Sequence, residues 1–328
     1  MGRYLITGGA GYIGSHMVLA LCDRGDECVV FDNLQQGHAE AVPAAARLIV
    51  GDLADGAAVD EVVGAGPWDA VFHFASLSLV GESMRRPFDY LMINGMNGIR
   101  LIDACVRHKV PKFVLSSTAN LFSIPDEIPI PENATIRPGS PYGESKHILE
   151  NALIWADRIH GFRSARIRYF NAAGADPKGR AGEDHHPETH LIPLAIDAAL
   201  GLAPPLVVFG DDYATRDGTC IRDYVHVADV ADAHLRAIGQ INDSSAVYNL
   251  GNGEGHSVFD VIRAVEAVSG LKVPRSIGER RAGDPAALVA SSAKLRTETG
   301  WRPRYADLET IVATAFQWRK GHLKGYAG

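Results

Sequence analysis

The chain has 328 residues, 46% of them hydrophobic, and a formal net charge of −7 at neutral pH. This length and apolar content suit one large α/β domain with an attached lobe. The acidic balance argues against a nucleic-acid-binding protein, which usually carries a basic patch. The scattered cysteines indicate free thiols in a reducing compartment, and not a disulfide framework or a zinc site; they are Cys22, Cys28, Cys105 and Cys220.

The chain begins directly in a strand pattern, so we expect no secretory leader. Its most apolar long stretch, Leu191–Gly210, is interrupted by Asp197 and three prolines, and we therefore expect no membrane span. Together these features predict a soluble cytoplasmic protein with neither a nucleic-acid nor a membrane partner.

Short strand patterns alternate with helical patterns through the first half of the chain. This alternation predicts an α/β fold with a doubly wound, Rossmann-like parallel sheet. The predicted helices include Met17–Cys22 and Asn97–His108. The predicted strands are Arg3–Ile6, Cys28–Asp32, Arg47–Val50, Ala70–Phe74, Lys112–Ser117 and Ser164–Asn171.

From about Ala172 the alternation loosens, and the stretch PKGRAGEDHHPET (177–189) is typical of a loop. We expect a first, doubly wound domain at residues 1–171 and a smaller, mixed α/β lobe at residues 172–328. Because Ala246–Asn252 again has the pattern of a core strand, residues 225–252 are expected to return to the first domain.

A glycine-rich turn, TGGAGYIGSH (Thr7–His16), joins the first strand to the first helix and places Gly8, Gly11 and Gly14 at G-x-x-G-x-x-G spacing. Such a turn brings backbone N–H groups close to a phosphate. The spacing alone is weak evidence, but Asp32 at the end of the second strand can accept hydrogen bonds from an adenosine ribose and repel a 2′-phosphate. The sequence therefore predicts NAD and not NADP.

Farther along, Tyr142 and Lys146 stand four residues apart in SPYGESKHILE, so on a helix they share one face. A surface pair is the ordinary interpretation of this spacing, but the strand end at Thr118 and the preceding nucleotide-binding half favour a proton-transfer site. A nearby ammonium and a positively charged nicotinamide ring would lower the pKa of the tyrosine from about 10 towards neutrality. The group could then take an alcohol proton while hydride leaves the carbon.

These motifs resemble the extended branch of the short-chain dehydrogenase/reductase superfamily and, within it, the UDP-glucose 4-epimerase family over almost the whole chain. The resemblance implies an enzyme of galactose metabolism that inverts C4 of UDP-glucose or UDP-galactose through a transient 4-keto sugar. It also implies a homodimer formed by helices at Asn97–His108 and Lys146–Ile159. The matching stretches are TGGAGYIGSH, FDNL, HFASLSLVGES, SPYGESK, RYFNAAGADP, DGTCIRDYVHVADVADAH, YNLGNGEGHSV, RRAGDPA and TGWRP.

The resemblance also implies which residues act. Tyr142 would be the base, Lys146 its partner, and Thr118 the hydroxyl that shares the sugar O4. The implied cofactor residues are Gly8, Gly11, Tyr12, Ile13, Gly14, Asp32, Asn33, Asp52, Leu53, Phe74, Ala75, Ser76, Asn94, Tyr142, Lys146 and Tyr169. The implied substrate residues are Thr118, Asn171, His190, Leu191, Val207, Phe209, Arg222, Arg281, Asp284 and Leu288.

Among the substrate residues, Asn171, Arg222 and Arg281 would hold the diphosphate, a role that suits the forked arginine side chain. Phe209 would pack on the uracil, and Asp284 would hold the uridine ribose. Surface salt bridges are the alternative interpretation of the arginines, and a core position is the alternative for Phe209. Asp52 is placed to reach the adenine, and an ordinary turn residue is an equally good interpretation of it.

The chain departs from the family pattern at Ser78, where a lysine is common, at Leu121–Ser123 in place of V-Y-G, and at His190 in place of an asparagine. Related sugar-nucleotide dehydratases and decarboxylases carry carboxylates after the catalytic hydroxyl, whereas this chain has Ala119 and Asn120. Elimination and decarboxylation are therefore not expected.

Two alternatives to a UDP-hexose epimerase remain open in the sequence. One is 4-epimerisation of UDP-N-acetylglucosamine or UDP-glucuronate, for which Leu288 matters because family members with tyrosine there are restricted to plain hexoses. The other is a non-catalytic NAD-binding regulator, which should have lost Tyr142 or Lys146. No metal is expected, because the adjacent His185 and His186 lie in a charged loop without a second pair at ligand spacing.

Overall fold

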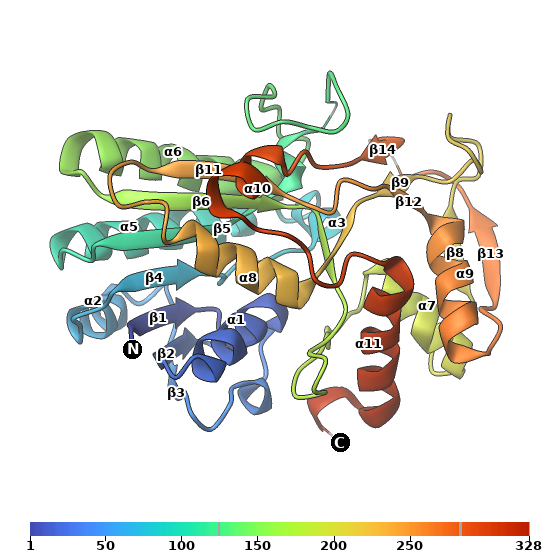
Figure 1. The fold of residues 1–328 in the computed structure, drawn as a ribbon, viewed down its shortest axis with the longest axis horizontal. Helices are drawn as coiled ribbons and strands as arrows, with labels where there is room; N and C mark the ends of the chain where they lie inside the picture. Colours follow the sequence, from blue (N-terminus) through green and yellow to red (C-terminus); the bar gives the residue numbers. More distant parts are fainter. Residues whose placement is uncertain (124, 282–283, 328) are drawn as a thin grey trace.

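Seven parallel strands form the centre of the computed structural model, which describes residues 1–123, 125–281 and 284–327 (Figure 1). Their order is β11-β6-β5-β4-β1-β2-β3, so the predicted doubly wound α/β class is confirmed. The strands are β1 (Arg3–Thr7), β2 (Glu27–Asp32), β3 (Arg47–Val50), β4 (Ala70–His73), β5 (Lys112–Thr118), β6 (Arg163–Tyr169) and β11 (Ala246–Leu250).

Helices cover both faces of this sheet, which is why strands such as β1 and β2 bury side chains on both faces. Leu5 packs into one core and its neighbour Ile6 into the other. The core around Ile6 receives α1 (Tyr12–Asp23), α8 (Val227–Ala237) and α10 (Ala293–Thr299). The core around Leu5 receives α2 (Gly56–Gly64), α5 (Asn97–Arg107) and α6 (Pro141–His160).

A smaller lobe lies beside the carboxyl ends of the strands, at the right of Figure 1. Its own core joins α7 (Leu191–Leu200), α9 (Val258–Ser269) and α11 (Leu308–Gly321) to the strand pair β8 (Leu206–Phe209) and β13 (Arg275–Gly278). Two small sheets connect it to the rest of the chain. They are β7 (Asn171–Ala173) with β10 (Tyr224–His226), and β9 (Ile221–Arg222) between β12 (His256–Ser257) and β14 (Ala287–Leu288).

Short helical segments complete the described chain: η1 (Ala39–Ala41), α3 (Val80–Ser83), α4 (Pro87–Tyr90), the π-helix η2 (Leu91–Met96), η3 (Ala119–Leu121) and η4 (Gly325–Ala327). Within the described ranges, no helix combines the length and the apolar character needed to cross a bilayer.

Three boundaries differ from the sequence-based expectation. The first helix begins at Tyr12, directly after the glycine turn, and not at Met17. The predicted strand Ser164–Asn171 is divided, because β6 ends at Tyr169 and Asn171 instead pairs with Tyr224 in a separate small sheet. The chain also returns to the first core near its end, where Leu295 and Trp301 are fully buried.

Candidate functional site

The three glycines of the first turn meet different steric demands. Gly8 has φ +74°, and a Cβ there would lie 2.2 Å from the backbone nitrogen of Ala75. A Cβ on Gly14 would lie 2.1 Å from the carbonyl oxygen of Gly8, so α1 can approach β1 only because this residue has no side chain. A Cβ on Gly11 would have Gly8 O at 3.4 Å as its nearest neighbour. Gly8 and Gly14 are therefore required by the fold, whereas Gly11 leaves open space beside the turn.

That open space belongs to a groove at the carboxyl ends of β1 to β4. Most of the predicted cofactor residues line it: Gly8, Gly11, Asp32, Asn33, Asp52, Leu53, Phe74, Ala75 and Ser76. The other predicted cofactor residues, outside its described lining, are Tyr12, Ile13, Gly14, Asn94, Tyr142, Lys146 and Tyr169.

The sequence analysis missed part of the groove wall. The loop Gln35–Gly37 lines the groove together with Leu77, Ile93 and Asn97. The loop could have been predicted, because it follows Asp32 and Asn33 closely in the sequence. No motif in the sequence indicates that Leu77, Ile93 and Asn97 line the groove.

Asp32 connects the glycine turn to the loop that follows β2. One carboxylate oxygen accepts a hydrogen bond from the Ala10 N–H at 3.0 Å, and the other accepts one from the Leu34 N–H at 2.9 Å. Burial raises the pKa of Asp32, and the two backbone hydrogen bonds oppose that shift. Asn33 donates to the Asp52 carboxylate at 2.9 Å, so these acids form one polar edge of the groove.

Predicted cofactor residues outside the groove lining make structural contacts. The Asn94 side chain accepts from the Leu77 N–H at 2.8 Å, donates to the Leu77 carbonyl at 2.9 Å, and donates to Ser145 of α6 at 3.1 Å. The Tyr12 hydroxyl donates to the Gly174 carbonyl at 2.6 Å, across to the second half of the chain. Ile13 follows it in the first turn of α1.

The helix α6 presents the two residues predicted to transfer the proton on one buried face. Ser140 caps its start by accepting a hydrogen bond from the Gly143 N–H at 3.1 Å, and Pro141 occupies the first turn. Tyr142 and Lys146 are 7% and 1% exposed, and the Lys146 ammonium donates to the Ser116 carbonyl at 3.0 Å. The predicted shared face is therefore confirmed, and the surface-pair alternative is wrong.

The pKa of Tyr142 departs from the expectation. Burial raises it, and only the hydrogen bond with Thr118 lowers it. Burial also lowers the pKa of Lys146 to about 7. The chain's own groups thus do not supply the predicted lowering, because the ammonium is itself destabilised by its buried position. That lowering would have to come from the positive charge of an oxidised nicotinamide ring.

Thr118 lies at the end of β5, opposite Tyr169 of β6. Its hydroxyl oxygen accepts hydrogen bonds from the N–H and the side-chain amide of Asn120, both at 3.1 Å. The Tyr169 hydroxyl lies 2.5 Å from the Ser116 hydroxyl. The carboxyl ends of β5 and β6 therefore hold Thr118 beside the buried face of α6.

A first group of predicted substrate residues meets where the small sheets adjoin β6. Asn171 begins β7, and its N–H donates to the Asp223 carbonyl at 3.0 Å. Arg222 pairs in register with Leu288 of β14 and forms an ion pair with the Asp284 carboxylate. Arg222 is thus already oriented, with its side chain 14% exposed.

A second group lies on the strand pair β8–β13. The Arg281 guanidinium lies 4.2 Å from the centroid of the Phe209 ring. Phe209 is 39% exposed and Val207 is 41% exposed, so the core interpretation of Phe209 is wrong. Residues 282 and 283 of the RRAGDPA stretch lie outside the described residues.

The remaining predicted substrate residues begin α7. His190 is its N-cap residue and Leu191 is its first residue. The His190 imidazole contacts the Glu183 carboxylate, which the sequence analysis did not anticipate.

Known proteins match this arrangement over nearly the whole chain. The model of the NAD dependent epimerase/dehydratase family matches residues 4–251. The UDP-glucose 4-epimerase of Halalkalibacterium halodurans is 46% identical over 325 residues, which cover 98% of this chain and 97% of that relative. A crystal structure of a UDP-glucose 4-epimerase has TM-score 0.96 at 45% identity and 99% coverage of both chains. The UDP-glucose 4-epimerase from Brucella ovis, crystallised in complex with NAD, has TM-score 0.94 at 40% identity, covering 97% of this chain and 98% of that one.

The glycine turn yields a paired prediction. Gly14→Ala should destabilise the nucleotide-free protein by about 1–3 kcal/mol, because its methyl group would overlap the Gly8 carbonyl. Gly11→Ala, at φ −78° with open space around it, should change stability by less than about 0.5 kcal/mol. Its methyl group would instead intrude on the groove and weaken NAD binding at least about tenfold.

Urea unfolding and calorimetric titration with NAD measure the two effects separately. Equal losses of stability in both variants would show that the close approach of α1 to β1 is not what requires glycine at position 14.

Proposed function

Because the chain belongs to the NAD dependent epimerase/dehydratase family, we propose that it is an enzyme that inverts C4 of a UDP-hexose and so interconverts UDP-glucose and UDP-galactose. The family resemblance seen in the sequence, the fold class and the NAD cofactor are confirmed. The observation that carries the activity is the buried face of α6, where Tyr142 and Lys146 lie beside Thr118 at the end of β5.

The groove at the ends of β1 to β4 fits NAD. Gly11 leaves room at the start of α1, where a helix N-terminus favours a diphosphate. Asp32 lies at the groove lining, where its carboxylate can accept hydrogen bonds from ribose hydroxyls and repel a 2′-phosphate. When bound, NAD supplies an acceptor for the hydrogen at sugar C4 and returns it to the opposite face.

The residues of the chain then account for the proton transfer. We assign Tyr142 as the base that takes the proton from the sugar O4 and later gives it back. Thr118 would hold the same oxygen through its hydroxyl. Lys146, held by the Ser116 carbonyl, would bind the cofactor ribose beside Tyr142.

The second lobe would hold the nucleotide while the sugar turns. We assign Asn171, Arg222 and Arg281 to the diphosphate, since Arg222 is oriented by its ion pair with one oxygen of Asp284. The other oxygen of Asp284 would remain to accept from the uridine ribose. The exposed ring of Phe209 would pack on the uracil. Inversion requires tight binding of the UDP and loose binding of the sugar, because a tightly held sugar could not present its other face.

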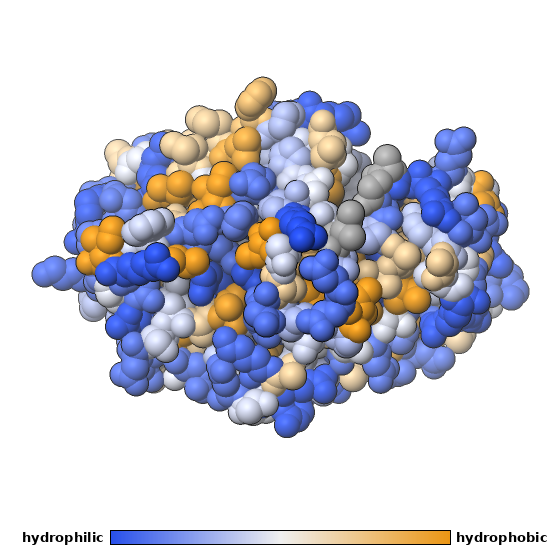
Figure 2. All heavy atoms as spheres, turned by 90° about the horizontal axis from the view of Figure 1, so that it is seen from above, coloured by the Kyte–Doolittle hydropathy of each residue, from blue (hydrophilic) through white to orange (hydrophobic). Residues whose placement is uncertain are grey.

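We also propose a homodimer. Large apolar side chains are exposed on η2 and on the neighbouring helix α6: Met92, Met96, Trp155 and Ile159. Figure 2 views the molecule from above, where Figure 1 places α6, and shows hydrophobic residues at its upper left. The expectation had placed the apolar faces on Asn97–His108 and Lys146–Ile159. Trp155 and Ile159 lie on the second of these helices, whereas Met92 and Met96 lie on η2, just before the first.

The four free cysteines, two of them buried, support the proposal that this enzyme works in the reducing cytoplasm.

Sedimentation equilibrium tests the dimer. We expect the parent chain to sediment as a dimer at micromolar concentration and Trp155→Glu to shift the equilibrium to monomer, because a carboxylate would be desolvated in the interface. Leu271→Glu, at another exposed apolar position, should leave the dimer intact. A parent chain that sediments only as a monomer would exclude the proposal.

Tyr142→Phe tests the assigned base. This change removes only the phenolic oxygen, so turnover of UDP-galactose should fall by about a hundred- to ten-thousand-fold while UDP binding stays nearly unchanged. Tyr305→Phe, between α10 and α11, is the matched control and should keep parental turnover. If Tyr142→Phe epimerises within a few-fold of the parent, another group takes the proton.

Leu288 provides the test of sugar selectivity. It is half-buried, pairs with Arg222, and packs against the cluster that contains Ala119, the residue after Thr118. We expect UDP-glucose and UDP-galactose to be the best pair, with weaker turnover of UDP-N-acetylglucosamine, because pocket space of one or two methylenes discriminates by only about 1–3 kcal/mol. Leu288→Tyr should abolish the N-acetyl activity and spare the hexose activity.

Parallel chromatographic assays of parent and variant on a set of UDP-sugars, including UDP-glucuronate, check this expectation and the alternative substrates together. An unchanged ratio of the two activities in the Leu288→Tyr variant would show that this side chain does not line the sugar pocket.

A further inference from the structure

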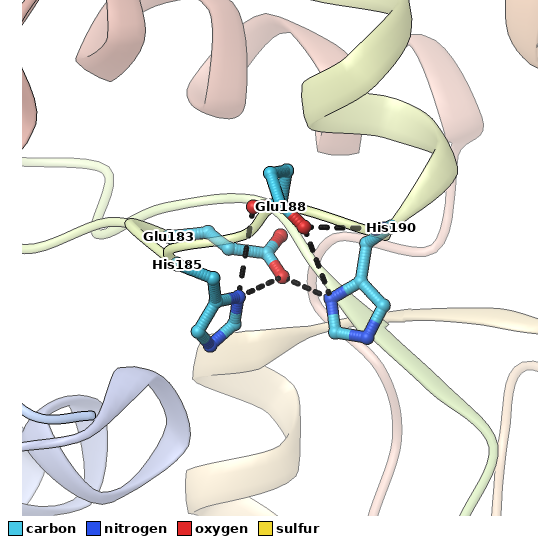
Figure 3. A group of neighbouring side chains, drawn as sticks. All are labelled: Glu183, His185, Glu188 and His190. Carbon is cyan, nitrogen blue, oxygen red and sulfur yellow. Dashed lines mark hydrogen bonds and ion pairs between the residues drawn. The ribbon is translucent and has the colours of Figure 1, made fainter. Parts of the chain in front are cut away.

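Four metal-ligating side chains converge on the segment that leads into α7. They are Glu183, His185, Glu188 and His190, drawn in Figure 3. The sequence analysis interpreted His185 and His186 as solvated loop residues. That holds for His186, whose side chain is 80% exposed, but the side chain of His185 is only 18% exposed and turns inward. The missed signal was the spacing E-x-H-x-x-E-x-H, which mixes the two ligand types.

The donor atoms of the four residues face one another. The His185 Nδ1 lies 3.3 Å from Glu183 Oε1 and 3.6 Å from Glu188 Oε2. The His190 Nδ1 contacts the same Glu183 oxygen and lies 3.9 Å from Glu188 Oε1. All four ligand atoms lie within 4.8 Å of one another. Figure 3 shows both imidazoles directing Nδ1, and not Nε2, towards the carboxylates.

Burial and backbone hydrogen bonds hold the carboxylates of this cluster in place. The side chains of Glu183 and Glu188 are 7% and 14% exposed. The Nδ1 of His185 is buried and, among the described residues, makes no hydrogen bond. Glu188 Oε1 accepts from the N–H groups of Thr189 and His190 at 2.7 and 2.8 Å. That carboxylate is therefore oriented by the backbone.

Contacts from distant parts of the chain hold the loop itself. The Tyr326 hydroxyl accepts from the Gly182 N–H at 3.0 Å, and the Asp184 carboxylate accepts from the Tyr326 N–H at 2.9 Å. The ring of Tyr12, in the first turn of α1, stands edge-on to His185 with centroids 6.1 Å apart. The four ligands are thus presented by a loop that is fixed on both sides.

We propose that Glu183, His185, Glu188 and His190 form a binding site for one divalent transition-metal ion, with zinc as the preferred ion. Imidazole nitrogens combined with carboxylate oxygens suit zinc, whereas magnesium and calcium prefer oxygen ligands alone. Ligand atoms about 2.0–2.1 Å from a tetrahedral zinc ion lie about 3.3–3.4 Å from one another, close to the separations of the His185 nitrogen from the two carboxylates. Two carboxylates and two neutral imidazoles balance the charge of a divalent cation.

Four protein ligands leave no open position, so the site is structural and not catalytic. The ion would cross-link Glu183 and His185 in the loop to His190 at the N-cap of α7. It would thereby fix the start of the second lobe next to Tyr12 of the first. This role is independent of the proposed epimerase activity.

Metal content is measured on the full-length chain without a polyhistidine tag. After incubation with zinc chloride and extensive dialysis, we expect one zinc per chain by mass spectrometry, and a melting temperature that rises with zinc concentration. Substitution of a residue that merely orients a ligand costs about 10–100-fold in metal affinity. Glu183→Gln and His185→Gln, which remove ligands, should therefore lose at least that much.

His186→Gln is the matched control, because it changes a neighbouring, exposed histidine outside the cluster. It should keep the parental stoichiometry. A parent chain that retains no zinc, or a His185→Gln variant that binds zinc as tightly as the parent, would overturn the proposal.

A visible absorption spectrum of the cobalt-loaded parent chain tests the site without any variant, and so is useful if a variant fails to fold. Cobalt in a tetrahedral site absorbs strongly in the visible range, so the parent chain should show this spectrum, and adding zinc should abolish it. A spectrum of octahedral type in the folded parent would also overturn the proposal.

Discussion

A buried ion pair between α6 and the central sheet is the interaction on which the candidate site depends. The Arg168 guanidinium of β6 donates to both oxygens of Glu150, at 2.9 and 2.5 Å, and the Ser117 hydroxyl of β5 donates to the same carboxylate at 2.6 Å. Burial raises the pKa of Glu150, but the contacts with Arg168 outweigh it and lower the pKa overall. Removing one partner of such a pair costs about 3–5 kcal/mol, because the other charge is left buried and uncompensated. Since Glu150 follows Lys146 by one helical turn, the pair fixes which face of α6 meets the ends of β5 and β6.

Close backbone approach determines the cofactor side of the site in a similar way. The carbonyl of Gly8 lies where a side chain on Gly14 would stand, so α1 starts against β1 and its first amides lie beside the groove. Asp32 then binds the N–H groups of Ala10 and Leu34. The carboxylate that is assigned to the ribose therefore also shapes the turn.

The residues assigned to the substrate come from both halves of the chain. The first half provides buried groups held by the sheet, such as Lys146 on the Ser116 carbonyl. The second half provides side chains on short strands, such as Arg222 with Asp284 and Arg281 with Phe209. Because β6 ends at Tyr169 and Asn171 already belongs to a small sheet, the change from one half to the other takes place within the site. The nucleotide and the sugar are therefore assigned to different elements of the candidate site.

Local patterns in the sequence were enough to predict the parallel sheet, the glycine turn, Asp32 and the Tyr142–Lys146 pair, because backbone geometry sets the period or spacing of each. Three other features depend on how the chain folds in three dimensions. Strand Ser164–Asn171 is divided because Asn171 finds its partner at Tyr224. The lowering of the Tyr142 pKa is not provided by Lys146, because burial destabilises that ammonium. His185 joins Glu183, Glu188 and His190 because contacts from Tyr326 and Tyr12 fold the loop inward. Each of these three features depends on contacts between residues far apart in the chain, and a local sequence pattern does not specify such contacts.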